Sequence, residues 1–215
     1  MALATDKLVF LHIPKTAGMF LRHVFKVCNI VHYEIGDQHA HFPYLSSLNP
    51  KEFYDSRLVF TFIRHPLTWY QSRWAFRVKH GWRAQHPLDY NCMSNDFHVF
   101  LENVIRYKPN GWVTWEYCNY IDTVPSGIDF IGRLENLVDD TIKVLRLAGE
   151  TFSENAVRSI PKINDSDMDG KSSKYWATYT PKLLDRISAL DGEIIRRYYS
   201  DYKIDPNILC HPRPY

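Results

Sequence analysis

The chain has 215 residues, of which 45% are hydrophobic and 23% are charged. These proportions are typical of globular proteins and exclude wholesale disorder and collagen-like or coiled-coil architectures; the length predicts one domain spanning residues 1–215. The 26 Lys and Arg residues nearly balance the 24 Asp and Glu residues, which argues against a nucleic-acid partner, because such proteins show a strong basic excess. A single anionic small molecule needs only a few local cations and fits this balance.

The first half of the chain shows strands alternating with helices. An almost continuous apolar run at 7–13 predicts a buried strand, and helical spacing follows at 19–27. Residues 29–35 and 57–63 predict two further strands. Pro66 is suited to the first turn of a helix over 67–79, where its missing N–H costs nothing.

The second half continues the alternation after a polar, aromatic stretch at 81–96. We expect helices over 97–107, 134–147 and 181–199, a third buried strand over 128–131, and a loop at 159–174. The fold class is therefore predicted to be α/β, a single domain with a central parallel sheet flanked by helices.

The cysteines and the N-terminus indicate a compartment. Cys28, Cys92, Cys118 and Cys210 form no C-x-x-C pair, which argues against a zinc ribbon or redox motif and fits reduced thiols. The N-terminal segment lacks the basic and long apolar regions of a secretory signal. Since no apolar run approaches the roughly 20 residues that span a bilayer, we expect a cytoplasmic protein without a membrane span.

The loop from Pro14 to Gly18 joins the first predicted strand to the first predicted helix. Ligands of open α/β sheets bind beyond the carboxyl ends of strands. Small residues let backbone N–H groups approach an anion, the helix N-terminus adds its positive dipole end, and Lys15 adds a full charge. The loop is not a Walker A motif, because the lysine precedes the glycine. It predicts a P-loop-like site for phosphate or sulfate.

A second junction of this kind follows the strand at 57–63. Arg64 ends a buried strand, where a guanidinium is costly unless it meets an anion, and Ser72 follows on the next helix. Taken alone, this pattern is equally well explained by an Arg–carboxylate pair. Together with the first loop, it predicts a nucleotide held at two phosphate positions.

Both junctions resemble motifs of the sulfotransferase superfamily. LHIPKTAG at 11–18 resembles the loop that binds the 5′-phosphosulfate of 3′-phosphoadenosine 5′-phosphosulfate (PAPS), and FTFIRHPLTWYQS at 60–72 resembles the segment that holds its 3′-phosphate. FIGRLENL at 130–137, Asn164 with Ser166, Tyr179–Pro181 and Asp201-Tyr202 resemble shorter motifs of membrane-type carbohydrate sulfotransferases and their bacterial relatives. The absence of a transmembrane stem indicates a bacterial or viral soluble relative.

The resemblance implies a set of cofactor-binding residues. The residues of the first loop and its helix start contact the 5′ side: Pro14, Lys15, Thr16, Ala17, Gly18 and Met19. Arg64 and Ser72 contact the 3′-phosphate, and Arg133 of the later motif and Lys171 of the loop at 159–174 add further contacts. Met19 departs from the family pattern, which has Thr or Ser after the glycine. Lys171 lies where the superfamily closes a loop over the nucleotide, and a solvated charge run is the alternative reading.

Sulfuryl transfer to a hydroxyl needs a base, and the imidazole of histidine is suited to it. His39 and His41 form an H-x-H segment; the resemblance to 2-O-sulfotransferases implies that His41 is the catalytic base, with His39 beside the acceptor. Metal binding lacks a nearby third ligand, and two surface histidines are the bland alternative. His12 and His65 lie in the cofactor loops and are expected to shape them.

These observations predict a PAPS-dependent sulfotransferase that uses no metal and acts on an acceptor hydroxyl. The resemblance favours a carbohydrate acceptor, whereas the Trp- and Tyr-rich stretch at 69–82 equally suits a lipid or phenol. Met19 favours the alternative of a non-catalytic protein that binds adenosine 3′,5′-diphosphate or a sulfated glycan. A nucleotide kinase is a weaker alternative, because the sequence lacks a Walker loop and magnesium ligands.

Overall fold

The computed structural model describes residues 2–37, 41–161, 177–205 and 209–210. The chain forms two compact units. The sheet unit comprises residues 1–64 and 116–164, and the helical unit comprises residues 65–115 and 165–215. Ser159–Lys174, the predicted loop, lies almost entirely outside the described residues, as do His39 and Lys171.

The sheet unit is built on a five-stranded sheet in the order β3-β1-β2-β4-β5. Its strands are β1 (Ala2–Ala4), β2 (Leu8–Leu11), β3 (Tyr33–Ile35), β4 (Leu58–Ile63) and β5 (Phe130–Arg133). β2, β4 and β5 are parallel to one another, whereas β1 is antiparallel to both of its neighbours. The carboxyl ends of three adjacent strands therefore meet at one edge of the sheet.

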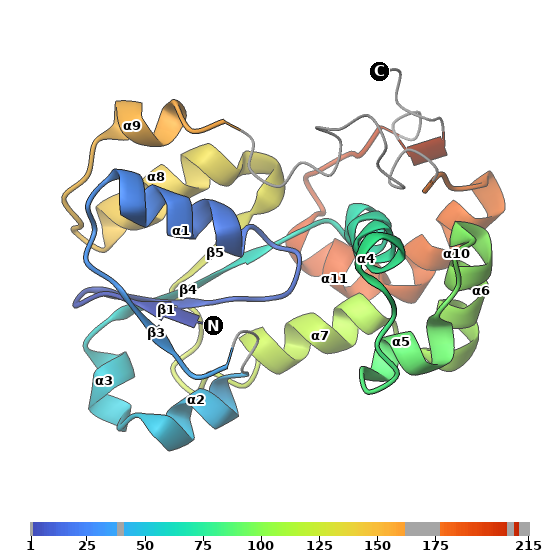
Figure 1. Ribbon diagram of the computed structural model, residues 1–215, viewed down its shortest axis with the longest axis horizontal. Helices are drawn as coiled ribbons and strands as arrows, with labels where there is room; N and C mark the ends of the chain where they lie inside the picture. Colours follow the sequence, from blue (N-terminus) through green and yellow to red (C-terminus); the bar gives the residue numbers. More distant parts are fainter. Residues whose placement is uncertain (1, 38–40, 162–176, 206–208, 211–215) are drawn as a thin grey trace. The chain divides into compact units, whose positions relative to one another are not determined.

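Helices cover both faces of this sheet (Figure 1). One face carries α1, α8 and α9, and the other carries α2 and α3. The bounds are α1 (Gly18–Val27), α2 (Phe42–Leu48), α3 (Lys51–Asp55), the 3₁₀ turn η1 (Leu134–Asn136), α8 (Leu137–Leu147) and α9 (Glu154–Arg158).

The main core of the sheet unit lies under α1, α8 and α9. Alternate sheet residues such as Phe10, Phe60 and Phe62 are fully buried there against apolar residues of the three helices. The other sheet face is buried as well: Val9 and Val59 are at most 2% exposed. Burial on both faces explains why these strands read as continuous apolar runs.

The helical unit packs around α4 (Pro66–His80), which contacts α6 (Phe97–Tyr107) and α10 (Pro181–Leu190). The other helices are α5 (Pro87–Cys92), α11 (Gly192–Tyr198) and α7 (Trp112–Ile121), whose residues from Glu116 on belong to the sheet unit. Its core is aromatic: Trp69, Tyr70 and Phe100 are at most 1% exposed.

The α/β class and the flanking helices are confirmed, with differences in detail. The sheet is mixed rather than wholly parallel, because β1 is antiparallel to both of its neighbours. β1 is not among the predicted strands, and the strand predicted over 29–35 is in fact the shorter β3, Tyr33–Ile35. The third predicted strand, 128–131, is shifted to Phe130–Arg133, so that Gly132 and Arg133 belong to it. The helix predicted over 97–107 is confirmed.

The helix predicted over 181–199 is in fact two helices that meet at Asp191. The buried carboxylate of Asp191 accepts hydrogen bonds from the Tyr70 hydroxyl at 2.8 Å and from the backbone and side chain of Thr114 at 2.8 and 2.9 Å. Gly111 makes room for this carboxylate: a Cβ there would lie 2.2 Å from its Oδ1, and its φ is +76°. Distant partners thus break a periodic pattern that continues through the junction.

Candidate active site

The loop between β2 and α1 has an alternating backbone. Lys15 and Ala17 have φ of 68° and 75°, and among the described non-glycine residues only Asn29 shares this sign, so that Thr16 between them has a negative φ. Successive residues of alternating hand form a nest, in which backbone N–H groups converge on an anion. The strain of two non-glycine residues at positive φ is typical of functional sites.

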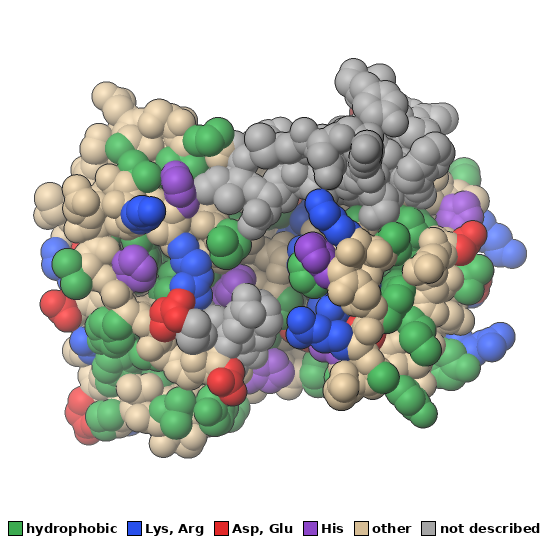
Figure 2. Space-filling view, in the orientation of Figure 1, with side chains coloured by type: hydrophobic (Ala, Val, Ile, Leu, Met, Phe, Trp, Pro, Cys, Tyr) green, Lys and Arg blue, Asp and Glu red, His purple; other side chains and the backbone are tan. Residues whose placement is uncertain are grey.

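The first turn of α1 adds to the positive character of this loop. Intrahelical hydrogen bonding begins with the Leu21 N–H, which donates to the Ala17 carbonyl at 3.2 Å, so the preceding N–H groups have no acceptor within the helix. The first turn contains no acidic residue. Lys, Arg and His side chains lie over α1 and beside it on the face shown in Figure 2.

Two side chains fix the loop from inside. Thr16 is fully buried, and its hydroxyl donates to the Ile13 carbonyl at 2.8 Å. His12 is 7% exposed, and its ring lies so close to Gly18 that an added Cβ would stand 2.1 Å from the ring. Glycine at 18 is therefore required by close approach, and His12 shapes the loop. Met19, by contrast, is 51% exposed in the first turn.

The strand register brings three cationic residues to the same sheet edge. Lys15 follows β2, Arg64 follows β4, and Arg133 ends β5, where it is paired with Ile63 in register. Each side chain is partly exposed. The backbone N–H of Arg133 donates to the Asp140 carboxylate at 2.7 Å, which anchors the strand end to α8.

Arg64 is held by a tyrosine that the sequence analysis did not single out. The Arg64 N–H donates to the Tyr117 hydroxyl oxygen at 3.0 Å, and that hydroxyl donates to the Arg64 carbonyl at 2.7 Å. Tyr117 is fully buried in α7. The contact joins residues 53 positions apart, so no local motif announces it.

His41 precedes α2 and packs against α7, the helix that also carries Tyr117. Its ring meets that of Tyr120 edge to face, with centroids 4.5 Å apart. The imidazole makes no capping hydrogen bond to α2. Partial burial lowers the pKa of His41, which keeps the ring neutral at neutral pH, as a proton acceptor must be. His39, its partner in the H-x-H segment, lies outside the described residues.

Two further predicted residues, Ser72 and His65, belong to the helical unit. Ser72 is half-buried on α4 and belongs to the helical unit, whereas Arg64 belongs to the sheet unit. His65 caps α4, with its Nδ1 accepting from the Leu67 N–H at 3.4 Å. Burial lowers the pKa of His65 to about 4, so this ring is neutral and structural.

Two further properties hold for the described part of the chain. Among its residues, no three His, Cys, Asp or Glu side chains gather as they would around a metal ion. None of its helices has the length and apolar composition needed to cross a membrane.

Comparison with known proteins identifies the family. No curated protein and no solved structure matches the chain significantly. A family model described as "Sulfotransferase family" matches residues 2–205 and so covers both units. The chain therefore belongs to the sulfotransferase family.

Proposed function

We propose that the protein transfers a sulfuryl group from PAPS to an acceptor hydroxyl. Family membership supports sulfotransfer in general. The observation that carries the choice of donor is the basic sheet edge, formed by the ends of three adjacent parallel strands. The nest with Lys15 follows β2, Arg64 follows β4, and Arg133 ends β5. A donor with one anionic group on the 5′ position and another on the 3′ position of its ribose suits several cations spread along one edge.

The described residues fit such a ligand. The nest and the first turn of α1 would hold the 5′ side, and Arg64 would hold the 3′-phosphate through a charge-assisted pair. Arg133 adds positive charge to the same edge. Contacts from Ser72 and Lys171, which lie respectively in the helical unit and outside the described residues, stay predictions.

Each catalytic side chain has a definable task. PAPS, when bound, supplies an activated sulfuryl group. Lys15 stabilises the negative charge that develops on the oxygen between the nucleotide phosphate and the departing sulfuryl group. Stabilisation by such a preorganised cation is commonly the largest catalytic contribution. His41 takes the proton of the attacking hydroxyl, for which its lowered pKa leaves the ring unprotonated.

The acceptor is proposed to be a carbohydrate, on the resemblance to carbohydrate sulfotransferases. A lipid or phenol would leave the donor side of the site unchanged. A panel of oligosaccharides, phenols and hydroxylated lipids, each incubated with sulfur-35-labelled PAPS and wild-type protein, identifies the class by the product that acquires label.

Lys15→Ala tests the donor side of the proposal in the same assay. Loss of a preorganised charge should lower kcat by roughly 10²–10³-fold, with little change in the affinity for adenosine 3′,5′-diphosphate. Lys26→Ala is the matched control, since Lys26 is an exposed lysine in the last turn of the same helix. Equal activity of the two variants would contradict the role of Lys15.

His41→Ala tests the base. Removal of a general base should cost roughly 10²–10⁴-fold in kcat and leave nucleotide affinity intact. A variant that keeps more than about a tenth of the wild-type kcat lies outside that range and would move the role to another residue.

Met19 supports a second candidate, a non-catalytic protein that binds adenosine 3′,5′-diphosphate or a sulfated glycan. The Thr16 hydroxyl is turned to Ile13, and Met19 supplies no hydroxyl. Under this alternative the nucleotide binds and no acceptor of the panel acquires label.

A further inference from the structure

Helix α7 contacts two of the proposed functional residues of the sheet unit. Tyr117 holds the backbone of Arg64, and Tyr120 packs against the ring of His41. The two tyrosines are three positions apart, so they lie on the same side of the helix. Both are fully buried, although nothing in their own segment of sequence predicts a role in the site.

The contact with Arg64 is a reciprocal pair of hydrogen bonds. The Tyr117 hydroxyl accepts from the Arg64 N–H and donates to the Arg64 carbonyl, at 3.0 and 2.7 Å. Arg64 stands just beyond the end of β4. A single buried hydroxyl therefore fixes the peptide units on both sides of the Arg64 Cα, from which the guanidinium extends.

The contact with His41 is one of ring packing. Tyr120 presents its ring at 67° to the imidazole with centroids 4.5 Å apart, an edge-to-face geometry that aromatic pairs favour. This packing restrains the orientation of the imidazole. The partial burial that lowers the pKa of His41 is consistent with this packing.

We propose that Tyr117 and Tyr120 are positioning residues for the reaction, Tyr117 by fixing Arg64 for the 3′-phosphate and Tyr120 by orienting His41 toward the acceptor. The inference rests on the proposed function. Helix α7 thereby positions Arg64 and His41, although its own side chains form no recognisable catalytic motif. The two tasks are separable, since one depends on a hydroxyl and the other on a ring.

Conservative variants separate these tasks. Tyr117→Phe keeps the ring and removes both hydrogen bonds, so it should reduce the preference for adenosine 3′,5′-diphosphate over adenosine 5′-monophosphate by about tenfold, with kcat at saturating PAPS nearly unchanged. Tyr120→Leu should lower kcat by about tenfold or more through misorientation of His41 and leave the nucleotide preference intact. Tyr120→Phe keeps the ring and should restore kcat.

Calorimetry with the two nucleotides measures the preference that Tyr117→Phe should change, and steady-state kinetics with PAPS measures the kcat that Tyr120→Leu should change. Thermal melting monitors the stability of each variant. If Tyr117→Phe keeps the full preference, or if Tyr120→Phe is as slow as Tyr120→Leu, the positioning roles are wrong while the proposed function stands. Losses in both readouts that follow the melting temperature indicate a merely structural role and overturn the inference. A wild-type protein without the nucleotide preference overturns the proposed function, and the inference with it.

Discussion

At the scale of single residues, the site depends on backbone groups more than the motif suggests. The only hydroxyl within the loop itself, that of Thr16, donates to the Ile13 carbonyl. Met19, the first residue after the loop, has an exposed side chain whose thioether offers no donor to an anion. Under the proposed function, the nest, the helix start and Lys15 therefore do most of the binding at the 5′ side of the nucleotide.

Met19→Thr tests this view by adding a donor. A hydroxyl in the first turn of α1 can donate to an anion held there, and a hydrogen bond to a charged group contributes about 1.5–3 kcal/mol. Adenosine 3′,5′-diphosphate should bind at least several-fold more tightly to Met19→Thr than to wild type by calorimetry. Met19→Ala removes the thioether without adding a donor and is the control; equal affinities of the Thr and Ala variants would contradict the prediction.

His65 makes stability depend on pH. Its pKa of about 4 in the folded protein lies below the usual value near 6.5, so the unfolded state binds more protons between these values. Stability should therefore fall as the pH drops from about 6.5 to 4, by about 3 kcal/mol in all. His41 contributes in the same direction.

The variant His65→Asn isolates the contribution of His65. Asparagine retains N-cap capacity and does not titrate. In urea unfolding between pH 7 and 5, the variant should lose less stability than wild type. A variant with the same pH dependence as wild type would show that His65 is not the titrating group.

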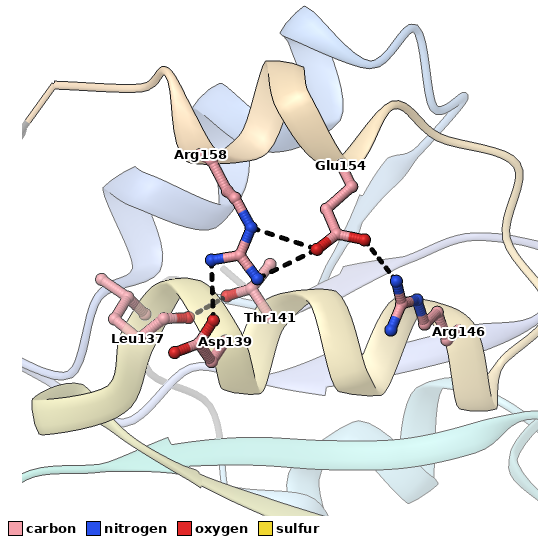
Figure 3. A network of polar contacts seen from close by, with 6 residues as sticks. All are labelled: Leu137, Asp139, Thr141, Arg146, Glu154 and Arg158. Carbon is pink, nitrogen blue, oxygen red and sulfur yellow. Dashed lines mark hydrogen bonds and ion pairs between the residues drawn. The ribbon is translucent and has the colours of Figure 1, made fainter.

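At the scale of elements, α9 is attached to α8 by a core contact and a surface ion network. Arg158 of α9 donates to Asp139 at 2.8 Å and to Glu154 at 2.9 and 3.0 Å, and Glu154 also pairs with Arg146 of α8 (Figure 3). These side chains are largely solvent-exposed, and such pairs stabilise little because water and salt screen them. Val157, in contrast, is fully buried in the main core.

Paired variants rank the two contributions. Val157→Ala should lower the free energy of unfolding by about 2 kcal/mol through lost burial and the cavity left behind. Arg158→Ala should have a much smaller effect that shrinks further in high salt. Urea unfolding at low and high ionic strength measures both; a larger effect for Arg158→Ala would reverse the ranking.

The elements predicted well are those whose signal is local and strong. β2, β4 and their following helices were identified because buried parallel strands produce apolar runs, and loops rich in small residues and Pro end them. β1 has three residues and no such run. The segment of α7 is mostly apolar and aromatic, and its polar residues Thr114, Glu116 and Asn119 do not gather on one face, so helical periodicity gave no indication of it.

At the scale of the whole molecule, the predictable part of the site is the part that follows strand ends. Lys15 and Arg64 were predicted because each lies beside the strand that positions it, and the register of β2, β4 and β5 then gathers them with Arg133. The support from Tyr117 and Tyr120 was not predictable, because it comes from residues more than 50 positions away in the chain. One family model nevertheless covers residues of both units.

The central claim is that the basic sheet edge binds a nucleotide with a 3′-phosphate, and one calorimetric comparison tests it most directly. Wild-type protein should bind adenosine 3′,5′-diphosphate more tightly than adenosine 5′-monophosphate, by about 2–4 kcal/mol for a charge-assisted pair. Arg64→Ala should abolish most of this preference while binding the monophosphate almost as wild type does. Equal affinities for the two nucleotides in the wild type, or a preference that survives in Arg64→Ala, would contradict the account.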